Sequence, residues 1–289
     1  MTHEEPAVIV RPEAIDRAVM AALDEDVGAG DVTGALLPAA GTLQATVVTR
    51  EQAVVCGRPW FDRVFARLDP RVRVQWLVDD GAEVSPGDVL CRLDGPARAL
   101  LAGERAGLNF LQTLSATATL TRGYVRQLAG RCRLLDTRKT IPGLRVAQKY
   151  AVRVGGGDNH RHGLFDEVLL KENHIAALGG VGPAVRAARA RYPDLVIVVE
   201  VETLAEFETA LGAPVDRILL DNFSLADIRT AVAAARAAPQ PKPLEVSGGV
   251  APDAVEAIAR TGVDAISVGA LTKNLQAIDL SMRIKALKD

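Results

Sequence analysis

Lysine is scarce in this chain and unevenly placed. Only seven of the 34 basic residues are lysines, and the first of them is Lys139. A carrier domain for biotin or lipoate needs an acceptor lysine, so residues 1–138 cannot supply one. This exclusion matters because the stretch VDDGAEVSPGDVLCRLDG has the spaced turn glycines of half a hammerhead fold. The local fold remains an expectation, whereas the carrier function is excluded.

Cysteine and long apolar runs are also limited. Cys56, Cys91 and Cys132 lie far apart without CxxC spacing, which argues against a disulfide framework or a zinc knuckle and predicts buried, reduced thiols. No apolar run approaches the ~20 residues that span a membrane. The opening MTHEEPAVIV is acidic where a secretory signal is basic, so we expect a cytoplasmic protein. The net charge of -2 gives no general affinity for nucleic acid or membrane.

The composition is that of a globular protein, and its 289 residues favour two domains. In the first half, helical periodicity predicts helices over 13–27 and 59–68, and alternating or β-branched runs predict strands over 42–50 and 71–78. Residues 97–129 have helical periodicity interrupted by SATATLT, which predicts two helices meeting there. We therefore expect an N-terminal α+β sandwich over 1–116 and a second domain over 117–275, with the tail 276–289 packing on the first.

Beyond residue 131 the pattern changes to short apolar runs, each followed by a helical stretch. The spacing between their ends, 21 to 35 residues, is typical of successive βα units in a parallel sheet, and the near-continuous apolar character indicates burial on both faces. About 150 residues is short of the ~250 of an eightfold barrel, so we expect an incomplete, six- to seven-stranded α/β barrel. The runs end at Asp136, Lys171, Glu200, Asp221, Ser247 and Gly269.

Cations follow three of these predicted strand ends or their loops. They are Arg138 and Lys139 in DTRKT, His160 and Arg161 in GGGDNHRHG, and Lys171 in LLKENH. A single basic loop is usually a solvated surface. Because the carboxyl ends of barrel strands meet at one mouth, these cations are expected to converge on a polyanionic ligand.

Two acidic residues and two glycine-containing segments complete the predicted pocket. Glu200 and Asp221 end neighbouring runs, where they can hold a hydroxylated sugar, a hard cation such as Mg²⁺, or both; alternatively they only neutralise the lysines. Ser247-Gly248-Gly249 and Gly269-Ala270 offer backbone amides near the chain end, where barrels often bind phosphate.

The histidines suggest a rival site. His160, His162 and His174 lie in one stretch with Lys171, as in a metal-dependent hydrolase barrel. The later strand ends offer Glu200 and Asp221 instead of imidazoles, so a two-metal site would lack ligands.

Longer motifs resemble one known family, the quinolinate phosphoribosyltransferases, also called carboxylating nicotinate-nucleotide pyrophosphorylases. The motifs run through most of the chain: GDVT, GERAGLN, DTRKTIPGLRVAQKYAV, GGGDNHRHGLFDEVLLKENH, EVE, LLDNF, EVSGGV and SVGALTKN. The resemblance implies a hammerhead-like N-terminal sandwich followed by an incomplete α/β barrel. It also implies transfer of phosphoribosyl from phosphoribosyl pyrophosphate to quinolinate with loss of CO₂, giving nicotinate mononucleotide and pyrophosphate for NAD biosynthesis.

The resemblance further implies residue roles. Arg105, Arg138, Arg161, His160 and Lys171 would hold the quinolinate carboxylates. The phosphoribosyl pyrophosphate and its Mg²⁺ would be served by Lys139, Glu200, Asp221, Ser247, Gly248, Gly249, Gly269 and Ala270. Thr140 is a further expected substrate-binding residue. Lys139, Glu200 and Asp221 are the expected catalytic residues, with Glu200 and Asp221 serving the metal directly or through the substrate. Arg105 would act in trans across a homodimer or a higher assembly of dimers.

Two positions depart from the family pattern. Ala116 stands in SATAT where glycine is usual, and Asn274 stands where histidine is frequent. Two alternatives stay open: the same scaffold acting on another ring acid, and a sensor that only binds nucleotide or ring acid.

Overall fold

The computed structural model describes residues 10–288, and the acidic start MTHEEPAVI lies outside this range. The chain divides into two compact units, one formed by 1–122, 140–156 and 271–289 and the other by 123–139 and 157–270. Within residues 10–288, no helix is both long and apolar enough to cross a membrane. All three cysteines are free thiols; Cys56 and Cys91 are buried and Cys132 is half-buried.

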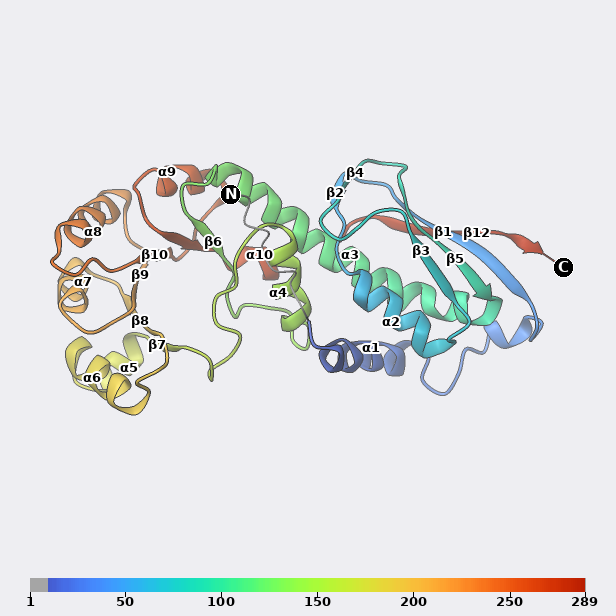
Figure 1. The fold of residues 1–289 in the computed structure, drawn as a ribbon, viewed down its shortest axis with the longest axis horizontal. Helices are drawn as coiled ribbons and strands as arrows, with labels where there is room; N and C mark the ends of the chain where they lie inside the picture. The colour runs from blue at the N-terminus through green and yellow to red at the C-terminus, as the bar shows by residue number, and fades with distance from the viewer. Residues whose placement is uncertain (1–9, 289) are drawn as a thin grey trace. The chain divides into compact units, whose positions relative to one another are not determined.

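The first unit is a layered α+β structure (Figure 1). Its four-stranded antiparallel sheet has the order β12-β1-β5-β3, and a short β2-β4 pair lies apart from it. The strands are β1 (Thr42–Thr49), β2 (Ala53–Val54), β3 (Arg73–Trp76), β4 (Glu83–Val84), β5 (Val89–Pro96) and β12 (Leu280–Lys288). The predicted strands at 42–50 and 71–78 are therefore confirmed.

Helices cover one face of this sheet. Leu43, Ala45, Val47 and Leu93 of the strands share a core with aromatic and leucine side chains of two helices. A second apolar layer joins these helices to the first helix through Val19, Trp60 and Phe110. The helices are α1 (Pro12–Asp26), α2 (Arg58–Leu68) and α3 (Ala97–Leu128), with a 3-10 turn η1 (Gly34–Leu36) between α1 and β1. Pro12 begins α1, where its missing N–H has no intrahelical partner to lose.

The expected break at SATAT is wrong: α3 is one helix of 32 residues that continues through position 116. Its hydroxyl groups find partners that leave the helix intact. Ser115 Oγ accepts from Cys56 N (2.9 Å), Thr119 Oγ1 accepts from Val54 N (2.8 Å), and Thr121 Oγ1 donates to Thr117 O (2.7 Å). Ser115 and Thr119 therefore attach α3 to the β2 segment, a use that helical periodicity alone does not reveal.

Residues 140–156 group with the first unit, although they follow a barrel strand. They contain α4 (Arg145–Val154), and the short α10 (Ala270–Lys273) lies next to it, since Gln148 Nε2 donates to Thr272 O (2.7 Å). Tyr150 Oη donates to Asp80 Oδ2 (2.7 Å) and its ring lies 5.4 Å from that of Trp60. Aromatic packing and a buried hydrogen bond thus attach this segment to the first unit.

The second unit contains a six-stranded parallel sheet in the order β6-β11-β10-β9-β8-β7. The six predicted apolar runs form its strands: β6 (Arg133–Leu135), β7 (Val168–Leu170), β8 (Ile197–Val201), β9 (Arg217–Asp221), β10 (Leu244–Ser247) and β11 (Ala265–Ser267). Among the described residues, no strand pairing joins β7 to β6, so the barrel is incomplete, as expected.

Helices lie outside this curved sheet (Figure 1). They are α5 (Glu172–Ala177), α6 (Val181–Arg191), α7 (Leu204–Leu211), α8 (Leu225–Ala237) and α9 (Val255–Ala259), with a 3-10 turn η2 (Pro252–Ala254). All five residues of β8 are buried, which explains why the strands have no polar alternation in sequence. Because all six strands run parallel, their carboxyl ends share one edge of the barrel.

Candidate active site

The carboxyl edge of the barrel brings Lys171 and Glu200 together. Lys171 follows β7, Glu200 lies in β8, and Lys171 Nζ is 2.5 Å from Glu200 Oε2. Glu200 is buried, whereas the Lys171 side chain is 42% exposed. Burial raises the pKa of Glu200, Lys171 opposes this shift, and Asp221 raises the pKa further. Asp221 at the end of β9 therefore lies in the electrostatic field of the same site.

Two guanidinium groups, those of Arg138 and Arg161, interact electrostatically with each other, and Arg161 also interacts with Glu200. Burial lowers the pKa of Arg161, the neighbouring Arg138 lowers it further, and Glu167, Asp166 and Glu200 raise it. Both arginines are half-buried. Like charges in a partly desolvated setting repel each other, and a bound anion relieves the repulsion. These electrostatic interactions, together with the Lys171–Glu200 contact, support the predicted anion pocket at Arg138, Arg161 and Lys171.

The glycine motifs lie at the same edge. Ser247 pairs with Asp221 across β10 and β9, and Asn222 N donates to Ser247 O (3.1 Å). Gly248 has φ +90°, and a Cβ there would lie 2.3 Å from Asn222 Oδ1, so only glycine fits this close approach. At the end of β11, a Cβ on Gly269 would lie 3.0 Å from Lys139 Cδ. The Lys139 stem thus packs against the glycine that precedes Ala270.

Arg105 and Thr140 belong to the first unit. Arg105 lies on α3 with 58% of its side chain exposed, 3.9 Å from Glu104. Thr140 Oγ1 accepts from Arg145 Nε (3.1 Å). The other predicted site residues belong to the second unit: Arg138, Lys139, His160, Arg161, Lys171, Glu200, Asp221, Ser247, Gly248, Gly249, Gly269 and Ala270.

The three histidines of the alternative metal-site hypothesis lie in different environments. His160 is 8% exposed inside the barrel, whereas His162 and His174 are exposed. His174 Nδ1 accepts from Lys171 N (3.1 Å), which orients the ring locally. Among residues 10–288, no group of three or more His, Cys, Asp or Glu side chains is arranged to hold a metal ion.

Sequence reasoning missed the residues that surround His160. Glu167, Arg217 and Glu245 all lie near its ring and are largely or fully buried. The available signal was a glutamate in the apolar run PLEVS: in a strand buried on both faces, a charged residue needs partners. These side chains form a charged cluster in the barrel interior.

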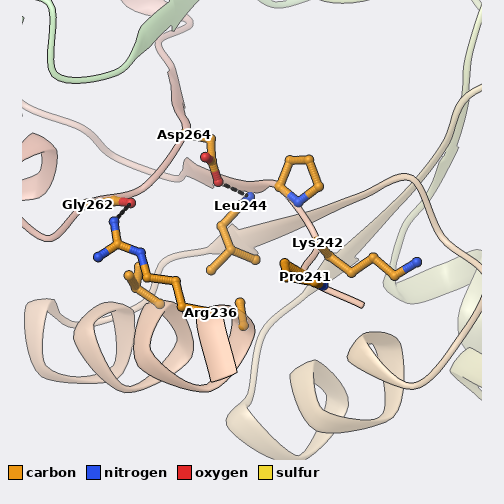
Figure 2. A pocket seen from close by; sticks show the side chains of 9 residues that line it. Arg236, Pro241, Lys242, Leu244, Gly262 and Asp264 are labelled. Carbon is orange, nitrogen blue, oxygen red and sulfur yellow. Dashed lines mark hydrogen bonds between the residues drawn. The ribbon is translucent and has the colours of Figure 1, made fainter. Parts of the chain in front are cut away.

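A pocket of about 220 Å³ lies at the opposite, amino-terminal ends of β10 and β11 (Figure 2). Arg236 Nη2 donates to Gly262 O (3.0 Å), and Asp264 Oδ2 accepts from Leu244 N (2.7 Å). These polar groups join α8 to the strand starts and share no residue with the predicted site. In α/β barrels this face serves stability, whereas the carboxyl face carries the chemistry.

Comparisons with known proteins agree with this architecture. The N-terminal domain of quinolinate phosphoribosyl transferase matches residues 31–115, and the C-terminal domain matches residues 117–283. The Mycobacterium leprae nicotinate-nucleotide pyrophosphorylase (carboxylating) is 40% identical over 277 residues, covering 93% of this chain and 97% of the relative.

Solved structures give the same result. The nicotinate-nucleotide pyrophosphorylase from Francisella tularensis is 43% identical with a TM-score of 0.92, covering 98% of this chain and 100% of that chain. NadC from Streptococcus pyogenes is 40% identical with a TM-score of 0.91, covering 97% of this chain and 99% of that chain. Both domain matches and these full-length similarities show that the chain belongs to the quinolinate phosphoribosyltransferase family.

Proposed function

We propose that this enzyme transfers the phosphoribosyl group of phosphoribosyl pyrophosphate to quinolinate, releasing pyrophosphate and CO₂ and forming nicotinate mononucleotide for NAD biosynthesis. The observation that supports assigning the reaction to this pocket is the Lys171–Glu200 pair at the carboxyl edge of the barrel, where Arg161 interacts electrostatically with both Arg138 and Glu200. Guanidinium groups bind carboxylates bidentately, and a lysine adds a point charge. A ring with two adjacent carboxylates matches this arrangement.

The charge distribution accounts for the chemistry. The ring nitrogen forms a bond to the anomeric carbon as the bond to pyrophosphate breaks, so positive charge develops on the ribose and negative charge on the leaving group. Glu200 and Asp221 can stabilise the first and Lys139 the second. The adjacent carboxylate then departs as CO₂ and leaves its electron pair on the ring carbon beside the positively charged nitrogen, which stabilises it; a proton from water completes the new C–H bond. No further cofactor is needed for the decarboxylation.

We propose that Mg²⁺ enters with the pyrophosphate substrate and that Glu200 and Asp221 serve it. The donor set supports this mode, because two carboxylates at neighbouring strand ends fall short of a complete protein cage. Mg²⁺ is commonly held by one or two carboxylates together with substrate phosphates and water. When bound, the ion would neutralise charge on the leaving pyrophosphate.

We further propose that Arg105 completes the carboxylate pocket of a partner subunit in a homodimer. The exposure of its side chain supports a role outside its own fold, since its Glu104 contact at 3.9 Å is weak. A twofold dimer would present each α3 helix to the partner and receive the same helix in return. The cytoplasmic location remains a prediction from residues outside the described range.

The purified chain, mixed with quinolinate, phosphoribosyl pyrophosphate and Mg²⁺, should form nicotinate mononucleotide and CO₂ in equal amounts. Nicotinate in place of quinolinate should react ~10³-fold less efficiently, because losing one carboxylate leaves pocket cations unpaired. Binding without turnover would support the sensor alternative. Comparable efficiency with nicotinate or another ring acid would support a scaffold with a different acceptor.

A further inference from the structure

His160 lies between two carboxylates in the barrel interior. Its Nδ1 is 3.3 Å from Glu167 Oε1, and its Nε2 is 3.4 Å from Glu245 Oε1. The His160 side chain is 7% exposed and that of Glu245 is fully buried. The two acids come from separate segments, since Glu167 immediately precedes β7 and Glu245 lies in β10.

Arg217, at the start of β9, joins the two acids. Its Nη2 is 2.9 Å from Glu167 Oε2, and its Nε is 2.9 Å from Glu245 Oε2. Burial by itself would raise the pKa of Glu245, but His160 and Arg217 reverse this effect, and the pKa is lowered overall. Glu245 is therefore ionised at neutral pH in the interior. We call His160, Glu167, Arg217 and Glu245 the interior cluster.

The interior cluster is connected directly to the backbone of the anion pocket. His160 N donates to Asp136 Oδ1 (2.9 Å), and Arg161 N donates to His160 Nδ1 (2.8 Å). Asp136 is itself fully buried and lies two residues before Arg138. The backbone segments that carry Arg138 and Arg161 are thus joined through His160 and Asp136.

Such a connection has a physical purpose in this pocket. Burial lowers the pKa of Arg161, and repulsion from the Arg138 guanidinium lowers it further. Without a bound anion, flexible side chains would separate, and binding would then require that they be ordered again. Groups held in place before binding avoid that loss of affinity.

Resting on the proposed function, we infer that Glu245, Arg217 and Glu167 are positioning residues for the dicarboxylate pocket. Because His160 Nδ1 accepts from Arg161 N, it has no proton to give Glu167; Glu245 contacts the Nε2 side of the ring (3.4 Å), and Glu167 acts by holding Arg217 (2.9 Å). The ring in turn fixes the backbone at Arg161 and so sets the affinity for quinolinate. The three positioning residues act through His160, not by contact with the substrate. A purely structural cluster would instead support the barrel without favouring either substrate.

The test compares Glu245→Gln with wild type by calorimetric titration of quinolinate and by steady-state kinetics for both substrates. The Kd and KM for quinolinate should rise ~10-fold, because a neutral amide holds His160 less firmly. The KM for phosphoribosyl pyrophosphate should change less than about twofold. Glu167→Gln should act in the same direction. Arg189→Met is the matched control, since it removes a partly exposed pair with Asp216 (2.6 Å) in the same unit.

The double variant Arg217→Met/Glu245→Gln separates positioning from stability. Removing one charge of each sign should lower Tm less than removing Arg217 alone, although Glu167 also loses Arg217 (2.9 Å) and keeps its contact with His160. Quinolinate affinity should stay low, because His160 still lacks its anchor. If Glu245→Gln does not fold, the double variant can be used in its place for the quinolinate titration.

The inference is overturned if folded Glu245→Gln or the double variant binds quinolinate as wild type does, or if both substrates lose affinity equally. Failure of the proposed function is a different result, because wild type itself would then show no turnover. If wild type binds quinolinate but does not turn it over, quinolinate titration of the variants would still test the inference.

Discussion

Lys171 Nζ lies 2.5 Å from Glu200 Oε2, so the cation that we propose binds substrate and the carboxylate that we propose is catalytic are held as one pair at neighbouring strand ends. Removing either partner changes the other. Since burial already raises the pKa of Glu200 and Lys171 opposes this, loss of the lysine should raise that pKa further.

Lys171→Met should therefore lower kcat/KM for quinolinate by ~10²-fold, through weaker carboxylate binding and a less ionised Glu200. Weaker carboxylate binding should appear as a higher KM for quinolinate. The lower ionisation of Glu200 should appear in the pH profile of kcat, whose acid limb should lie at higher pH than in wild type. Glu200→Gln is the comparison, because it should lower kcat with a smaller change in quinolinate Kd. If Lys171→Met left quinolinate binding intact, the lysine would serve only to neutralise Glu200.

Asp221→Asn tests the metal-bound half of the site. Asp221 Oδ2 accepts from Asn222 Nδ2 (2.8 Å), and the amide of the variant keeps the size of the group while removing its charge. Turnover should fall and the Mg²⁺ concentration for half-maximal rate should rise, because one anionic donor is lost. Calorimetry should show nearly unchanged quinolinate binding. A collapse of quinolinate affinity with an unaltered Mg²⁺ requirement would contradict the assignment.

Gly248→Ala should destabilise the protein by ~1–3 kcal/mol, since it combines a positive φ with a Cβ 2.3 Å from Asn222 Oδ1. Gly249→Ala has a positive φ but open space, so a smaller loss is expected. Gly123→Ala lies in the exposed part of α3 with nothing nearby and should stabilise by ~0.5–1 kcal/mol. Urea unfolding of the three variants gives the order of their free energies of unfolding. Equal effects at 248 and 249 would show that the Asn222 contact is unimportant.

Cys132 offers a pH test outside the active site. Burial and then Asp264 raise the pKa of its thiol to about 11. Iodoacetamide labelling should therefore rise about tenfold per pH unit from pH 7 to 10 without a plateau, because only the thiolate reacts. The folded protein holds this proton more tightly than the unfolded chain, so the associated stability is lost as pH rises toward about 11. Cys132→Ser should abolish the labelling, because Cys56 and Cys91 are buried. A plateau near pH 8.5 would contradict the shift.

The barrel strands could be predicted because burial on both faces removes polar residues from them, as in β8. The carboxyl ends then indicated Lys171, Glu200 and Asp221 without any tertiary information. The continuity of α3 could not be predicted, because Ser115 and Thr119 bond to a segment about sixty residues earlier. The interior cluster was missed for a related reason: each charged residue resembles a surface residue until its partners on other strands are known.

Complementation between two inactive variants can show whether the Arg105 of each active site comes from the same chain or from the partner subunit. An inactive Arg105→Ala chain is mixed with an inactive Lys139→Ala chain under conditions in which subunits exchange. If Arg105 acts in trans, each mixed dimer has one site with both defects and one intact site, so activity should recover toward about half per mixed dimer. Glu104→Ala is a suitable control, because it removes the weak neighbouring contact at 3.9 Å and leaves the arginine in place.

The alternative is that Arg105 serves the pocket of its own chain. Each mixed dimer would then contain one site lacking Arg105 and one lacking Lys139, and neither could turn over. Differently tagged subunits, recovered as mixed dimers by two successive affinity steps, establish that exchange has occurred. Activity that stays at the level of the separate variants in those purified mixed dimers would reject the composite site, while recovery would require that the arginine cross to the partner.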